Sequence, residues 1–172
     1  LLLLPGKPHA DSEQVGRVCG RVEGEGFSGI VAIGSGTVND IAKMSATLSG
    51  VPYIAFATAA SMNGYTSGIA AILADGLKIT VPARPPRALI MDSNVLAKAP
   101  PELAQAGLGD LLSKPVSTAD WWIGDRLEGR GFDELPGRIV DDAVRQATKH
   151  ATGLPLGDPL AHEALARALV LS

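Results

Sequence analysis

Short apolar runs alternate with longer stretches of helical spacing at the start of the chain. Three runs, at 1–4, 29–33 and 52–57, have the length and composition of buried strands. A helix is expected after the first run, where Asp11 and Gln14 have the spacing of a capping box. A second helix is expected at about 37–49, with one apolar face formed by Val38, Ile41, Ala42, Ser45 and Leu48. This order of strands and helices predicts a parallel sheet with right-handed crossovers.

The pattern changes after residue 68. Apolar runs at 69–73 and 77–81 flank Asp75-Gly76, a pair typical of a tight hairpin, and one more strand is expected at 88–92. All later segments have helical spacing. The expected helices are 102–128, interrupted near Gly107-Leu108-Gly109 and kinked at Pro115, then 136–151 and 159–171.

These elements predict an α/β fold in which a Rossmann-like, parallel-sheet nucleotide domain precedes an all-helical domain. The expected division is 1–99 and 100–172, with the boundary at 98–101. The chain is expected to be truncated at both ends, because it has no initiator methionine and its last helix lacks a cap. On this interpretation the first elements of the nucleotide domain are missing, and 100–172 is only the start of the helical domain.

Composition narrows the classes of function. The formal net charge is −3, the sequence has no basic stripe, and aromatic residues make up 4% of the chain. These features argue against a surface that binds nucleic acid. No apolar run reaches the roughly 18 residues that a membrane-spanning helix needs, so we expect no membrane partner. Cys19 is the single cysteine and cannot form a disulfide within the chain, which favours a reducing, cytoplasmic location.

A glycine-rich loop lies between the second predicted strand and the second helix. Such a point presents unpaired backbone N–H groups and the positive end of a helix dipole, and it binds phosphate well. The loop does not match the common dinucleotide fingerprint, because Asn39 stands at the third glycine, and it lacks the P-loop lysine. A plain strand-to-helix connection is the alternative. The candidate residues are Gly34, Ser35, Gly36, Thr37, Val38, Asn39 and Asp40.

A second candidate loop follows the strand at 52–57. Small and hydroxylated residues at the carboxyl end of a parallel strand are where α/β sheets bind ligands. The alternative is a surface loop whose hydroxyl groups bond to its own backbone. The candidate cofactor contacts here are Thr58, Ala59, Ala60, Ser61 and Ser67.

Asp110 is expected just after a glycine break and at the start of a helix. In that position it could be an N-cap or a metal ligand. The three histidines are scattered and none has a partner at ligand spacing; for His162 a solvent-facing or structural role is favoured. Of the adjacent Trp121 and Trp122, at least one is expected in the core.

Four blocks of the sequence, in this order, resemble the iron- or zinc-dependent polyol dehydrogenase superfamily, and most of all its glycerol-1-phosphate dehydrogenases. The resemblance implies a dehydroquinate synthase-like architecture and reversible hydride transfer between NAD(P)H and dihydroxyacetone phosphate, for phospholipid biosynthesis. The cofactors that it implies are NAD(P) and one divalent metal, which is zinc, with iron or nickel as alternatives. The implied substrate is a small phosphorylated polyol or ketone. A homo-oligomer is one of the assemblies that remain open. The matching blocks are 34–43, 58–72, 78–100 and 107–122.

The resemblance also assigns roles to residues. It implies that the loop 34–40 binds the pyrophosphate, that 58–61 and Ser67 contact the cofactor, that Asn63 faces the substrate, and that Asp110 binds the metal at the catalytic centre. Asn63 stands where the family usually has aspartate, which leaves the true substrate open. The two metal-binding histidines would lie beyond Ser172. A dehydroquinate synthase-like lyase that uses NAD, and a nucleotide-binding module without catalysis, are the alternatives.

Overall fold

The computed structural model describes residues 1–4, 6 and 8–172, and the chain divides into two compact units. The first comprises Leu1–Thr58 and Gly64–Asp92, and the second comprises Ala59–Asn63 and Ser93–Ser172. Each unit is described by itself. The division falls after Asp92, ahead of the boundary expected at 98–101.

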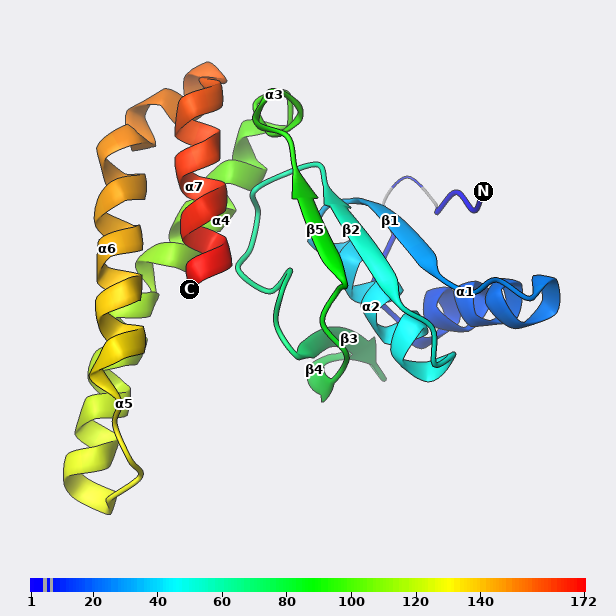
Figure 1. Cartoon of the computed structure of the whole chain (residues 1–172), viewed down its shortest axis with the longest axis horizontal. Helices are drawn as coiled ribbons and strands as arrows, with labels where there is room; N and C mark the ends of the chain where they lie inside the picture. The colour runs from blue at the N-terminus through cyan, green and yellow to red at the C-terminus, as the bar shows by residue number, and fades with distance from the viewer. Residues whose placement is uncertain (5, 7) are drawn as a thin grey trace. The chain divides into compact units, whose positions relative to one another are not determined.

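The first unit is built on a three-stranded parallel sheet, in the order β1-β2-β5 (Figure 1). The parallel sheet predicted from the sequence is therefore confirmed. The register sets Gly34 of β1 opposite Ala57 of β2, so that the carboxyl ends of these two strands are level. The strands are β1 (Ile30–Gly34), β2 (Tyr53–Ala57) and β5 (Ala88–Met91).

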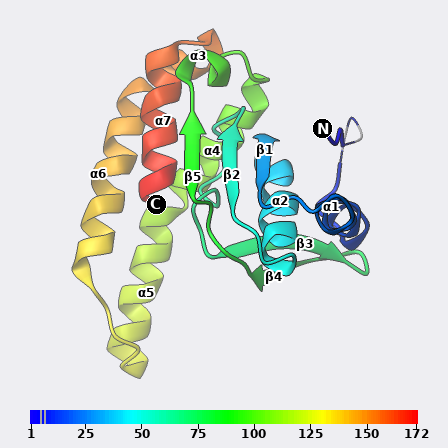
Figure 2. The same cartoon turned by 45° about the vertical axis from the view of Figure 1, so that its right-hand side comes forward.

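Two helices accompany this sheet. In α1 (Ser12–Glu25) the Asp11 carboxylate accepts a hydrogen bond from the Gln14 backbone N–H at 2.9 Å, which confirms Asp11 as the N-cap. The Gln14 side-chain oxygen accepts from Arg17 at 2.9 Å. The next helix, α2 (Gly36–Leu48), packs its alanines 42 and 46 against Ala32, Tyr53 and Ala55 of the sheet. Figure 2 shows α2 alongside the strands. Tight packing of small side chains thus holds α2 against the sheet.

The hairpin forms where it is predicted, with β3 (Ile69–Ala74) antiparallel to β4 (Leu77–Pro82). Asp75 and Gly76 both have positive φ, at 50° and 77°, as a two-residue hairpin turn with the right twist requires. Asp75 tolerates this backbone because short polar side chains enter the left-handed region more readily than others.

The strand predicted at 1–4 is wrong. These residues belong to no strand, and Leu1 and Leu3 are exposed while Leu4 packs against the cluster around Val15 and Ile72. A strand needs a hydrogen-bonded neighbour. Of the described residues ahead of α1, it is Ala10 and Asp11 that meet a strand, through the Leu73 N–H to Ala10 carbonyl bond and a bridge from Asp11 to Leu73.

The second unit consists of helices, as the sequence predicts, together with the segment 59–63. The last helix, α7, packs against four other helical elements of this unit, and α6 runs beside it in both views (Figures 1 and 2). Its core is made largely of alanine and leucine. The elements are α3 (Ser93–Leu96), α4 (Pro101–Leu112), α5 (Lys114–Glu128), α6 (Glu134–His150), the 3-10 helix η1 (Ala151–Leu156) and α7 (Pro159–Leu171).

The helix break predicted near residues 107–109 is wrong, because α4 continues through both glycines to Leu112. The chain changes helix at Ser113 instead, two residues before Pro115. Proline has no N–H to donate to the carbonyl four residues earlier, so it is accommodated in the first turn of a new helix. Gly107 has a different use: it is buried where α4 meets the segment 59–63, and a side chain there would overlap the Ala60 carbonyl oxygen.

The tryptophans are also placed differently from the prediction. Trp121 and Trp122 are 38% and 46% exposed, and α5 buries none of its residues. The Trp121 indole N–H donates to the Gly131 carbonyl at 2.7 Å, and its ring contacts Phe132 edge-on. Trp121 therefore packs against the loop that follows α5 and not in the core. Within the described part of the chain, no helix is long and apolar enough to cross a membrane.

Candidate functional site

The glycine loop lies at the carboxyl end of β1, where Ser35 is the N-cap residue of α2. Its backbone is extended (φ −89°, ψ −164°), and its side chain makes no capping hydrogen bond to the described residues. Positions 34–38 are half-buried. The amino end of a helix with an uncapped first turn is a site for an anion.

Asn39 and Asp40 lie further into the unit than the rest of this loop. They are 2% and 9% exposed, and the Tyr53 hydroxyl donates to the Asn39 side-chain oxygen at 3.3 Å. Burial raises the pKa of the Asp40 carboxyl, and the charge of Lys43 opposes that rise. Burial also raises the pKa of the Tyr53 phenol. The side chains of Asn39 and Asp40 therefore face the interior of the first unit rather than the accessible part of the loop.

Gly34→Ala is expected to disrupt this loop. An added Cβ would lie 2.6 Å from both Cβ and Cγ2 of Val38, so either the strand end or the first turn of α2 has to move. We expect nicotinamide nucleotide binding to weaken by about tenfold or more in a fluorescence titration of the full-length protein. The matched control is Gly20→Ala on α1, where a Cβ meets nothing within 4 Å. Equal affinity in the two variants would contradict a role for this loop in binding.

The predicted cofactor contacts after β2 divide between the units. Thr58 belongs to the first unit, and its N–H donates to the Gly34 carbonyl at 3.0 Å, which joins it to the glycine loop. Ser67 is also in the first unit, where its hydroxyl lies 3.1 Å from the Lys43 ammonium group. Residues 59–61 belong to the second unit, in which Ala59 and Ala60 are fully buried and Ser61 is half-buried.

Lys43 was missed by the sequence interpretation, although it is a buried charged side chain with several hydrogen-bonding partners. It lies on α2 with a relative exposure of 0%, and its ammonium group is within hydrogen-bonding distance of Gly64, Ser67 and Ile69. Burial lowers the pKa of this lysine, and the charge of Asp40 opposes the change. Lysine and aspartate three residues apart on one helix were the available signal, because such residues share a face.

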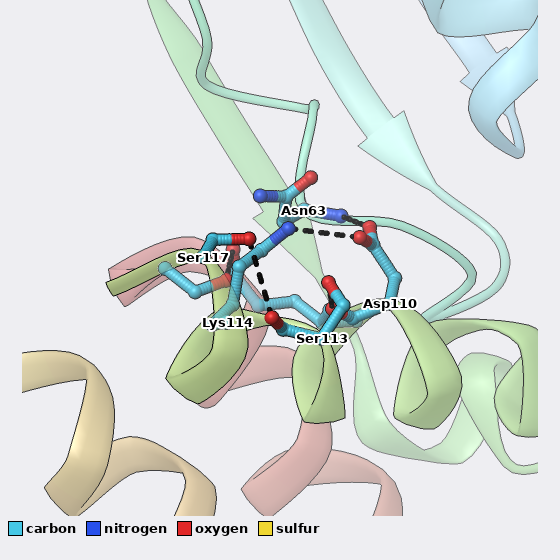
Figure 3. A network of polar contacts seen from close by, with 7 residues as sticks. Asn63, Asp110, Ser113, Lys114 and Ser117 are labelled. Carbon is cyan, nitrogen blue, oxygen red and sulfur yellow. Dashed lines mark hydrogen bonds and ion pairs between the residues drawn. The ribbon is translucent and has the colours of Figure 1, made fainter. Parts of the chain in front are cut away.

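Asp110 is the centre of a polar network in the second unit (Figure 3). One carboxylate oxygen accepts the Asn63 backbone N–H at 2.8 Å, and the other accepts the Lys114 ammonium group at 2.9 Å. The two side chains of this ion pair are 29% and 19% exposed. Both carboxylate oxygens therefore have a donor, and the segment that carries Asn63 is tied to α4.

The position of Asp110 differs from the prediction. It lies in the last turn of α4 and not at the start of a helix, so it is no N-cap. The serines nearby bond to the helix backbone: Ser113 Oγ donates to the Asp110 carbonyl at 2.7 Å, and Ser117 Oγ donates to the Ser113 carbonyl at 3.2 Å. The carboxylate is therefore free of a helix-capping role and remains a candidate ligand.

A divalent metal would find only part of its ligand set here. No group of three or more His, Cys, Asp or Glu residues gathers among the described residues. His162 does not add to Asp110, since it lies buried on α7 at 1% exposure with neither ring nitrogen hydrogen-bonded in the described structure. It is therefore not solvent-facing. A catalytic metal takes about three protein ligands, and among the described residues Asp110 is one candidate for such a ligand.

Comparison with known proteins decides the family. Residues 2–100 match the family model described as iron-containing alcohol dehydrogenase. The chain belongs to this family. Among curated relatives, it is 39% identical over 143 residues to a glycerol-1-phosphate dehydrogenase [NAD(P)+] of Bacillus velezensis, covering 83% of this chain and 36% of the relative. A protein of the same name from Thermococcus kodakarensis is 32% identical over 161 residues, covering 94% and 46%.

Solved structures agree with the family assignment. A probable glycerol dehydrogenase from Sinorhizobium meliloti 1021 superposes with a TM-score of 0.82 at 25% identity, covering 96% of this chain and 49% of that one. A maleylacetate reductase from a Rhizobium strain, at 17% identity, shares the fold with a TM-score of 0.81. The resemblance inferred from the four sequence blocks and the predicted α/β fold are confirmed. This member of the iron-containing alcohol dehydrogenase family spans less than half the length of the relatives it matches.

Proposed function

We propose that the protein to which this chain belongs is an NAD(P)-dependent oxidoreductase that reduces dihydroxyacetone phosphate to glycerol 1-phosphate. In that reaction the carbonyl carbon accepts a hydride from the reduced nicotinamide and the carbonyl oxygen accepts a proton. The observation that carries the proposal is the Asp110 carboxylate held against Asn63, in a chain whose curated relatives are named for this activity.

The first unit is proposed to bind the nucleotide. The pyrophosphate would accept hydrogen bonds from the uncapped first turn of α2, and Gly36, the first residue of that helix, has no side chain to obstruct its approach. Thr58 is bonded to the Gly34 carbonyl, and Ser67 follows the same strand β2. Both are proposed to offer hydroxyl groups to the cofactor, and Ala59, Ala60 and Ser61 to offer backbone groups or a hydroxyl.

The second unit is proposed to hold the substrate end of the reaction. Asp110 contributes one ligand to a divalent cation, for which zinc is favoured over iron or nickel. Such a cation, when bound, would polarise the substrate carbonyl and stabilise the alkoxide. Lys114 neutralises part of the Asp110 charge, and the Asn63 N–H orients the carboxylate. The side chain of Asn63 is proposed to meet the substrate.

The decisive experiment is NADH oxidation by the full-length protein with dihydroxyacetone phosphate, with dihydroxyacetone, or with neither. Turnover that is selective for the phosphorylated ketone and lost on treatment with a chelator is expected. Restoration by zinc, iron or nickel would then identify the metal, and a parallel series with NADPH would give the cofactor preference. NADH binding without reduction of either ketone would reject the dehydrogenase and favour a lyase or a binding module.

The proposal extends to location and assembly. Cys19 is a free thiol among the described residues, which is in keeping with a reducing cytoplasm. A homo-oligomer is proposed as the working form, and light scattering of the full-length protein tests it. A single monomeric mass across the working concentration range would reject it.

A further inference from the structure

A fully buried lysine on α2 has no role in the functions considered so far. Lys43 lies one turn after Asp40 and has a relative exposure of 0%, whereas lysine is almost never fully buried without a partner. Its ammonium nitrogen is 2.6 Å from the Gly64 carbonyl, 3.0 Å from the Ser67 carbonyl and 2.9 Å from the Ile69 carbonyl. The cost of burying this side chain is therefore offset by a dedicated set of oxygen atoms.

The geometry suits the ammonium form of Lys43. A backbone carbonyl can only accept, and the ammonium group has one donor for each of the three carbonyls within hydrogen-bonding distance. The Ser67 hydroxyl, 3.1 Å away, completes the shell and is itself placed to donate to the Gly64 or Ile69 carbonyl. A charged donor makes each of these bonds stronger than a bond between neutral groups.

All the acceptors belong to one short segment. Residues 64–69 form the loop that follows β2 and lead into β3, and they are far from Lys43 in sequence. Asp40 faces the continuation of the same segment, and the Ala71 backbone there lowers the pKa of its carboxyl group against the effect of burial. The Lys43 side chain thus fastens residues 64–69 to the helix that begins at the glycine loop.

We propose that Lys43 is a positioning residue for the nucleotide: its ammonium group holds the loop 64–69 in the conformation that presents Ser67 to the cofactor. This inference rests on the proposed function, in which Ser67 contacts NAD(P). Lys43 itself touches no cofactor in this scheme, since its side chain is enclosed and its donors are all occupied by the loop. It acts through Ser67 and the backbone around it.

The bonding partners of Lys43 distinguish a role in positioning the loop from a role in stabilising the whole fold. Without the ammonium group, the carbonyls of Gly64, Ser67 and Ile69 lose their charged donor, and buried unpaired carbonyls are unfavourable. The loop is then expected to move toward water, while the sheet and its core around Ala42 and Ala46 keep their packing. The effect should therefore be local to the loop and to nucleotide binding.

The test compares the full-length protein with its Lys43→Met and Lys43→Arg variants, using Lys149→Met on α6 as a control in which an exposed lysine is changed. In Lys43→Met we expect amide hydrogen exchange in 64–69 to be about tenfold faster. We also expect KM for NADH to rise about tenfold with kcat changed less than about twofold. Lys43→Arg keeps the charge and should restore part of the affinity, and the control should match the wild type.

Each outcome decides a separate question. Unchanged exchange in 64–69 together with an unchanged KM in Lys43→Met would overturn the positioning role. If Lys43→Met does not fold, an unchanged KM for NADH in Ser67→Ala would overturn it instead, because Lys43 acts on the cofactor through Ser67. If the wild type itself does not bind NADH, the proposed function fails, and the exchange data still report whether Lys43 holds the loop.

Discussion

Asp110→Asn in the full-length protein is expected to lower kcat/KM for dihydroxyacetone phosphate by about 10³-fold and to abolish stoichiometric metal binding. The amide is nearly the same size, and its single oxygen can still accept the Asn63 N–H, whereas the Lys114 ammonium group loses the acceptor seen in Figure 3. Lys114 is 19% exposed and can turn to water, so the fold should persist. What is lost is the negative charge that a divalent cation needs, and loss of charge stabilisation at a reacting oxygen costs this order of magnitude. Steady-state kinetics and metal analysis of the purified variant measure both effects.

The control for this prediction is Asp120→Asn on α5, which removes the same charge from an exposed position in the same unit. It is expected to keep its metal content and its activity. Full metal content in Asp110→Asn, or equal activities in the two variants, would reject Asp110 as a ligand and would direct attention to other carboxylates.

Gly107→Ala is expected to destabilise the protein by about 3 kcal/mol and to abolish activity. The added Cβ would overlap the Ala60 carbonyl oxygen, lie 2.9 Å from the Ala60 carbonyl carbon and lie 3.1 Å from Leu169. The Ala60 carbonyl belongs to the backbone and cannot rotate away as a side chain could, so the segment 59–63 has to move from α4. The expected loss of stability is therefore near the upper end of the range for overpacked sites. That segment carries Asn63, whose N–H orients Asp110. Urea unfolding followed by tryptophan fluorescence gives the change in stability.

Gly109→Ala is the matched control, two residues further along α4. Its Cβ meets nothing within 4 Å, so the alanine should raise stability by about 0.5–1 kcal/mol through its helix propensity. Opposite signs for the two substitutions are expected. A stabilising effect of Gly107→Ala would show that the segment 59–63 does not approach α4 as closely as described.

Local signals in the sequence were sufficient wherever an element depends on its own residues. The Asp11 cap, the Asp75-Gly76 turn and the apolar strands predicted at 29–33 and 52–57 are confirmed, because capping and positive φ depend on adjacent residues. The apolar run at 1–4 forms no strand, because a strand also needs a neighbour. The sequence also predicted the family through four blocks in order, and residues 2–100 match its model. The roles assigned to 34–40, 58–61, Ser67, Asn63 and Asp110 remain predictions.

Signals with two meanings misled the prediction. A Gly-Leu-Gly triplet is typical of a helix break, yet Gly107 lies inside α4 because it is the point where the helix meets Ala60. The error moved Asp110 from the last turn of α4 to the start of a helix. Trp121 is large and apolar, as core residues often are, but it is exposed on α5. Its indole N–H donates a hydrogen bond to the Gly131 carbonyl.

By itself the sequence determined the order and type of most elements, the parallel sheet and the family, since these follow from periodicity, turn chemistry and motifs along the chain. The tertiary structure alone decided which distant groups meet: Lys43 with the carbonyls of 64–69, and Gly107 and Asp110 with the segment 59–63. The physical reason is that a buried charge and a missing Cβ acquire meaning only from the atoms that surround them. Those atoms come from residues 20 or more positions away, which no local pattern specifies.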